Sequence, residues 1–103
     1  SALFDDKSQN IRSIWTIKAG LEWGTPFILY WEMYNNEIKP KTGNQVGYWL
    51  ITDEGVKQPI WHTHYNFYNE AQTYLTSYHK KNKELPSFDQ FRIDALKFKS
   101  LNP

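Results

Sequence analysis

The sequence predicts an α/β fold, and three observations support this expectation. Residues 8–24 and 59–81 each repeat apolar side chains at the three-to-four spacing of a helix. Between them, Phe27–Trp31 is a run of five large apolar residues without alternation. Such a run is typical of a strand that protein covers on both faces. The order helix, strand, hairpin, long helix and short helix therefore favours a covered β layer over an antiparallel meander.

The first helix is expected over residues 8–24. The Ser8 hydroxyl can cap its N-terminus, and Gly24 suits the left-handed conformation that ends a helix. Pro26 cannot continue the helix. Its apolar face is predicted to comprise Ile11, Ile14, Trp15, Ala19 and Leu21 or Glu22.

The segment that follows the strand is rich in turn formers. Residues 35–45, NNEIKPKTGNQ, combine two asparagines with Pro40 and Gly43 and predict a loop. Residues 46–60 then predict a short extended piece, a turn at 53–55 and a return piece. A strand covered on both faces needs parallel neighbours, and the chain offers few. We therefore expect the strand to pair with another molecule or to belong to the end of a larger α/β domain.

A long helix is expected from Pro59 to Lys81, because proline suits the first helical position. Its apolar stripe is predicted to comprise Ile60, His64, Phe67, Tyr68, Ala71, Tyr74, Leu75 and Tyr78. After a break at Pro86, Ser87 and Gln90 form a capping box that begins a short helix. Residues 1–103 are thus interpreted as one domain or domain fragment, with an α/β portion at 8–81 and a helical tail at 84–103.

Composition narrows the classes of partner. The 103 residues include 12 basic and 11 acidic side chains, so a net charge of +1 gives no field that attracts nucleic acid. No apolar run approaches the ~20 residues that span a bilayer, so no membrane partner is expected. The chain has no cysteine, which excludes disulfides and thiolate metal sites. The stretch SALFDDKSQN lacks the apolar core of a signal peptide. Localisation therefore stays open.

The candidate site is WEMYNNE at the carboxyl end of the predicted strand, where α/β proteins bind their ligands. The flat indole of Trp31 suits the C–H face of a sugar ring, and Asn35, Asn36 and Glu37 suit its hydroxyl groups. The alternative is a core tryptophan followed by a polar turn. Glu32 and Glu37 are not expected to be a catalytic pair, because both flank one strand end, whereas glycosidase carboxylates normally come from different strands.

A second candidate is the pair His62 and His64. On a strand, both imidazoles would share a face and could bind a metal ion. On the predicted helix they point roughly 200° apart, so we expect no metal site. No nucleotide-binding or serine-hydrolase motif occurs, and no cofactor is expected.

Two stretches resemble a known family. SQNIRSIWTIKAGLEWGTPFILYWEMYNNE and GYWLITDEGVKQPIWHTHYNFY are similar to the C-terminal end of bacterial (β/α)₈-barrel proteins of the glycoside-hydrolase type. In those TIM-type barrels a helix ending in glycine leads to a last strand with a Trp-x-x-Tyr-x-Asn-Glu cluster, and a Lys-Gln-Pro entry begins the closing helix. The resemblance covers about residues 8–70, whereas Phe88 onward lies outside it.

The resemblance implies a C-terminal βα portion of a carbohydrate-active barrel. It implies that an aromatic wall of the sugar site is supplied by Trp31, Glu32, Tyr34, Asn36 and Glu37. The family's catalytic carboxylates come from earlier strands and have no matching positions here, so no catalytic residue is expected. The implied partners are a carbohydrate and the remainder of the barrel or a second copy of the chain. An extracytoplasmic or secreted parent agrees with the resemblance.

A different class of protein also fits the composition. Five Trp, seven Tyr and six Phe make up 17% of the chain. Such rings fill the core of a small domain or form a surface that stacks on flat ligands. The alternative function is therefore a free-standing, aromatic-rich and non-catalytic module that binds carbohydrate or another protein.

Overall fold

The computed structural model describes residues 6–25, 50–52 and 54–103. These ranges form the three helices α1 (Asp6–Trp23), α2 (Pro59–Asn82) and α3 (Phe88–Ala95). A short 3-10 helix, η2 (Lys99–Leu101), follows α3. None of the helices in this part of the chain is long and apolar enough to cross a membrane.

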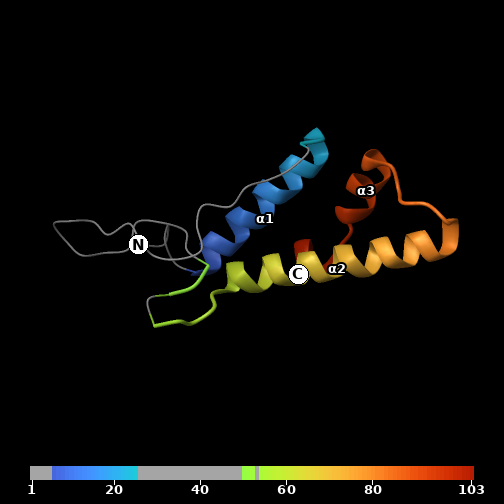
Figure 1. Cartoon of the computed structure of the whole chain (residues 1–103). Helices are drawn as coiled ribbons and strands as arrows, with labels where there is room; N and C mark the ends of the chain where they lie inside the picture. The colour runs from blue at the N-terminus through green and yellow to red at the C-terminus, as the bar shows by residue number, and fades with distance from the viewer. Residues whose placement is uncertain (1–5, 26–49, 53) are drawn as a thin grey trace.

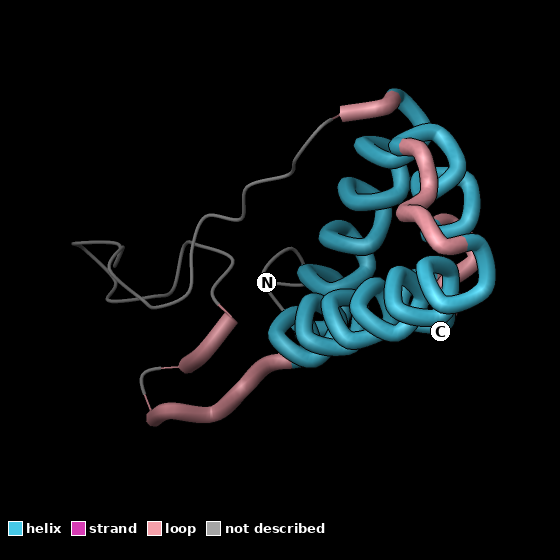
Figure 2. The backbone as a smooth tube through the Cα atoms, turned by 45° about the vertical axis from the view of Figure 1, so that its right-hand side comes forward, coloured by secondary structure: helices cyan, strands magenta, loops and turns pink. Residues whose placement is uncertain are grey.

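The predicted α/β fold class is wrong for the described part of the chain. Helices dominate it, and no strand or sheet forms there (Figure 2). The nearest approach to a sheet is an isolated antiparallel bridge between Ile51 and Lys57, around a turn in which Thr52 and Gly55 are hydrogen-bonded. The apolar stripes of the helices pack on one another. A 3.6-residue period predicts a helix, but it does not specify whether a sheet or another helix covers the apolar face. The predicted strand Phe27–Trp31 lies outside the described residues.

The helix α1 begins two residues earlier than predicted, at Asp6, so Ser8 lies within its first turn rather than at its cap. Its end is as predicted. Gly24 adopts a left-handed conformation with φ +83°, and its N–H donates to the carbonyl groups of Gly20 and Leu21 at 3.0 and 3.3 Å. A non-glycine residue would strain the backbone at this position.

The buried face of α1 is rotated relative to the prediction. Ile14 and Leu21 are buried as expected, together with Ile17. In contrast, Ile11 is 47% exposed and Trp15 is 64% exposed. The predicted stripe mixed two adjacent faces, and the face through Ile14 is the one that packs against the core cluster of the described residues.

The prediction for the long helix is confirmed. Pro59 is the first residue of α2, and Lys83 ends the helix with φ 63° while its N–H donates to the carbonyl of His79. Ile60 and Thr63 are its buried residues. Tyr68, which was expected on the apolar stripe, is 61% exposed.

The helices α1 and α2 begin close together and diverge, and α3 lies near their separated ends (Figure 1). At the shared end, the Thr63 hydroxyl donates to Asn10 Oδ1 at 2.6 Å, and Ser13 Oγ lies 3.2 Å from His64 Nε2. Burial lowers the pKa of the His64 imidazole. At the far end, Arg92 connects α3 to the last turn of α1.

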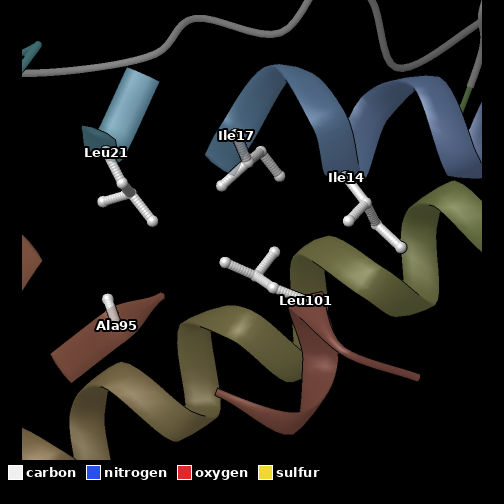
Figure 3. Close-up of a cluster of buried hydrophobic side chains, with 5 residues drawn as sticks. All are labelled: Ile14, Ile17, Leu21, Ala95 and Leu101. Atoms are coloured by element: carbon white, nitrogen blue, oxygen red, sulfur yellow. The ribbon is translucent and has the colours of Figure 1, made fainter. Parts of the chain in front are cut away.

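The apolar core lies between the diverging helices. Figure 3 shows Ile14, Ile17 and Leu21 of α1 pointing toward Leu101 and Ala95. Both Leu101 and Ala95 have no exposed surface. Four partly buried side chains extend the cluster: Phe67, Phe91, Leu96 and Phe98. The C-terminal tail thus supplies the side chains that cover α1, a role that a sheet was expected to fill.

The helix α3 begins as the capping box predicts. Ser87 Oγ accepts a hydrogen bond from the Gln90 N–H at 3.1 Å. The Gln90 side chain donates to Asp94 Oδ2 at 2.9 Å, and the Tyr74 hydroxyl donates to the same oxygen. The bond from Tyr74 attaches α3 to the second half of α2.

Candidate functional site

A groove of about 850 Å³ runs along the first half of α2. We call it the α2 groove. Its volume lies within the range of small-molecule binding clefts. The lining residues are Asn10 of α1, Pro59, His62, Thr63, Asn66, Asn69 and Glu70 of α2, and Lys99, Ser100 and Pro103 of the tail.

Helical geometry explains why the α2 residues share one wall. Residues three, four and seven positions apart lie on the same face of a helix. Positions 59, 62, 66 and 69 follow this spacing over three turns, with 63 and 70 beside them. At 1.5 Å per residue, Pro59 and Glu70 lie ~16 Å apart along the axis. The groove is therefore elongated rather than round.

The floor of the groove is fixed by the contact between α1 and α2. Thr63 is 7% exposed and donates to Asn10 Oδ1. This bond uses one acceptor of the Asn10 amide, whose nitrogen has two further donors. A polar group is thus held at the position where the two helices meet.

Glu70 holds the tail against α2. Its Oε2 accepts the N–H of Lys99 at 2.9 Å, and its Oε1 accepts the N–H of Ser100 at 2.7 Å. A carboxylate suits this position, because the first N–H groups of a helix lack partners within the helix. Partial burial acts to raise the pKa of Glu70, but the interactions with Ser100 and Lys99 outweigh it and lower that pKa. The carboxylate stays ionised at neutral pH.

Asn66 and Asn69 are exposed along the wall, and within the described ranges neither amide makes a hydrogen bond. An Asn side chain donates two hydrogen bonds and accepts two. The exposed His62 imidazole adds a further polar group at the first turn. The wall therefore presents groups that both donate and accept, as hydroxyl groups of a ligand require.

An aromatic row borders this polar wall. The rings of Trp61 and Tyr65 stack with centroids 4.8 Å apart and planes 13° from parallel. The Lys57 ammonium lies 4.2 Å from the centre of the Trp61 ring. Trp61 is thus covered by Lys57 and Tyr65, whereas Tyr65 and Tyr68 stay 51% and 61% exposed. Tyr65 and Tyr68 are the rings that this row offers to a ligand.

The site residues predicted from the sequence are Trp31, Glu32, Tyr34, Asn36 and Glu37, and all lie outside the described residues. Their place in the fold stays a prediction. The sequence reasoning missed Asn66 and Asn69. The sequence contained an indication of these two residues. Asparagine is a poor helix former, so two asparagines three residues apart on one face of a helix indicate a role other than helix formation.

His62 and His64 differ in burial and in location. His64 is half-buried against Ser13, whereas His62 is exposed and lines the groove. Across the ranges that the structure describes, no group of three or more His, Cys, Asp or Glu side chains could hold a metal ion.

No protein-family model, no curated protein and no solved structure matches this chain. The function is therefore inferred from the groove itself.

Proposed function

We propose that this chain is a non-catalytic, helical carbohydrate-binding module whose binding surface is the α2 groove with its aromatic row. The observation that carries the proposal is the pairing of Asn66 and Asn69 with the exposed rings of Tyr65 and Tyr68 on one half of one helix. A sugar has an apolar C–H face and a rim of hydroxyl groups. The tyrosine rings suit the C–H face, and the asparagine amides suit the hydroxyl groups.

The carboxylate of the groove supports a binding role rather than hydrolysis. Cleavage of a glycosidic bond needs two carboxyl groups at a set separation. Of the groove-lining residues that the structure describes, Glu70 alone carries a side-chain carboxylate. Both of its oxygens accept backbone N–H groups of the tail, so Glu70 serves to hold η2 in place.

The shape of the site also suits an oligosaccharide. The groove is open and elongated over three turns of α2, so a chain of sugar rings can lie along the helix. Side chains on a helix keep their spacing without ligand, which limits the ordering cost of binding.

The test is a binding measurement on the full chain. Calorimetric titration with cellopentaose, xylopentaose, maltopentaose and chitopentaose is expected to reveal saturable binding of at least one sugar. The double variant Asn66→Ala/Asn69→Ala is expected to weaken that binding about tenfold, which is about 1.4 kcal/mol.

The matched control is Thr76→Ala/Ser77→Ala, which changes two exposed residues of α2 beyond the groove. It is expected to bind like the parent chain. Equal loss in both double variants, or no binding of any pentasaccharide, contradicts the proposal and favours a protein partner for the aromatic row.

A further inference from the structure

We infer that the carbohydrate site continues from the α2 groove onto α1, where the Trp15 indole receives a further ring of a longer oligosaccharide; this inference rests on the proposed function and extends its site. A second cleft, of about 340 Å³, lies between α1 and the tail. We call it the Trp15 cleft. Its lining residues are Ile11, Ile14, Trp15 and Lys18 of α1, and Leu101, Asn102 and Pro103 of the tail.

The Trp15 indole is free to meet a ligand. It is 64% exposed, and within the described ranges it takes part in no hydrogen bond or ring contact. Trp61 differs, because Lys57 and Tyr65 cover its ring. An indole offers a broad flat apolar face and one N–H donor. Trp15 therefore presents, at the edge of a cleft, the surface on which the C–H face of a sugar stacks.

A hydrogen-bond donor is held beside this ring. Lys18 lies three positions after Trp15, next to it on the helix surface, and its Nζ donates to Asn102 Oδ1 at 2.8 Å. Asn102 is itself held, because its Nδ2 donates to the carbonyl groups of Leu96 and Phe98, each at 2.8 Å. An ammonium group has three donors, so two remain for the hydroxyl groups of a sugar.

The floor of the Trp15 cleft belongs to the apolar core. Ile14 and Leu101 are both buried, and Figure 3 shows their side chains pointing toward each other. A floor made of packed core residues keeps its shape without ligand, which limits the ordering cost of binding. The cleft is therefore formed before a sugar arrives.

The Trp15 cleft and the α2 groove meet at Pro103, which lines both. On α1 they are also adjacent, because Asn10 lines the groove and Ile11, the next residue, lines the cleft. A sugar chain that leaves the groove past Asn10 and Pro103 enters the cleft directly. The second contact is then made within one complex, which raises the affinity for a ligand long enough to reach both.

The experiment compares ligands that differ in length. The full chain is titrated calorimetrically with the trisaccharide and the hexasaccharide of whichever of the four sugars binds best. We expect the hexasaccharide to bind at least about tenfold more tightly than the trisaccharide. Asn66→Ala/Asn69→Ala is expected to weaken the binding of both sugars, because both occupy the α2 groove.

Two tryptophan variants locate the second contact. Trp15→Ala is expected to weaken hexasaccharide binding about tenfold and to change trisaccharide binding less than about twofold. Trp15→Phe keeps a flat ring and is expected to lie between Trp15→Ala and the parent chain. The matched control is Trp23→Ala. Trp23 is also on α1 and 89% exposed, but it lines neither the groove nor the Trp15 cleft, so this variant is expected to bind both sugars as the parent chain does.

Thermal denaturation of Trp15→Ala shows whether its fold is intact, and we expect the curve of the parent chain because the ring is mostly exposed. Unchanged hexasaccharide binding by Trp15→Ala overturns this inference and leaves the binding role of the α2 groove standing. Equal weakening of the two sugars, or an equal loss in Trp23→Ala, does the same. Failure of every sugar to bind overturns both proposals.

Discussion

The first half of α2, residues 59–70, carries four aromatic rings and the second half, residues 71–82, carries two, and the exposed rings lie in the first half. In the first half, Tyr65 and Tyr68 remain more than half exposed. In the second half, Tyr74 lies against Phe91 and Phe98, with ring centroids 5.8 and 5.9 Å apart. The tail packs against Tyr74, so this ring is partly buried. The comparison shows that aromatic content by itself does not separate a packing role from a binding role.

Position around the helix explains the difference. Each residue turns the helix by about 100°. Phe67 and Tyr74 lie two turns apart on the face that meets the tail, and Phe67 contacts Phe98 at 5.6 Å. Tyr68 lies one residue, about 100°, further round, and is exposed. We therefore expect substitutions in the two halves to affect different properties, stability in one and binding in the other.

The largest effect is expected at the core that the tail completes. Leu101→Ala removes a side chain with no exposed surface from the cluster of Ile14, Ile17 and Leu21. The cavity is expected to reduce the free energy of unfolding by about 2–5 kcal/mol. Urea denaturation followed by circular dichroism measures it. A loss below about 0.5 kcal/mol, the size of an ordinary surface change, would contradict the packing described here.

The next effect is expected at the contact between α3 and α1. Arg92 Nη1 donates to the carbonyl oxygens of Leu21 and Glu22 at 2.7 and 3.1 Å, in the last turn of α1, where carbonyl groups lack partners within the helix. Arg92→Ala is expected to cost about 2 kcal/mol of stability. Arg92→Lys keeps the charge but loses the fork of donors, so thermal denaturation should place it between the parent and the Ala variant.

A smaller effect is expected where the second half of α2 meets α3. Tyr74→Phe keeps the ring but loses the hydrogen bond to Asp94, at a cost of about 1 kcal/mol. Hydrogen bonds from Tyr74 and Gln90 lower the pKa of Asp94 despite its partial burial. Burial, the hydrogen bond to Asp94 and the nearby charges raise the pKa of Tyr74 to about 12.

The pKa shifts of Asp94 and Tyr74 limit the pH range over which their hydrogen bond stabilises the fold. A carboxyl group with a lowered pKa stabilises the fold above its unfolded pKa, near 3.9 for Asp, and the gain is lost as the pH falls through the folded value. A phenol with a raised pKa stabilises below its unfolded pKa, near 10, and that gain is lost as the pH rises toward 12. Denaturation across the pH range should therefore show both losses in the parent chain. Tyr74→Phe is expected to lack the alkaline loss and to show a weaker acid loss.

The smallest effect on stability is expected in the first half of α2. Tyr65→Ala removes an exposed ring, so the free energy of unfolding should change by less than about 0.5 kcal/mol. Binding of the best neutral pentasaccharide is expected to weaken about tenfold. Tyr65→Phe keeps the ring and should bind nearly as the parent chain does. A large loss of stability in Tyr65→Ala would show that the two halves do not divide the roles.

Local signals in the sequence predicted several elements correctly. Pro59 marked the start of α2, and Ser87 with Gln90 marked the start of α3. Gly24 marked the end of α1. Each of these depends on the backbone preferences of one or a few neighbouring residues, which the chain carries with it in any fold.

Other predictions failed because they required knowledge of what covers each face. Ile11 and Trp15 have the same apolar character as Ile14, yet only Ile14 is buried. The contact that selects the face comes from Leu101, far along the chain. The α2 groove was missed for the same reason, since Asn10 lines it together with Asn66 and Asn69 only when α1 packs against the start of α2.

By itself, the sequence determined where α2 and α3 begin and where α1 ends, since capping hydroxyls, prolines and glycines act within a turn of their own position. The tertiary structure decided the class of the fold in the described residues, the buried face of α1 and the existence of the groove. These depend on contacts between segments distant along the chain. Burial of any apolar face stabilises the fold, and the spacing of apolar residues does not specify which segment covers that face.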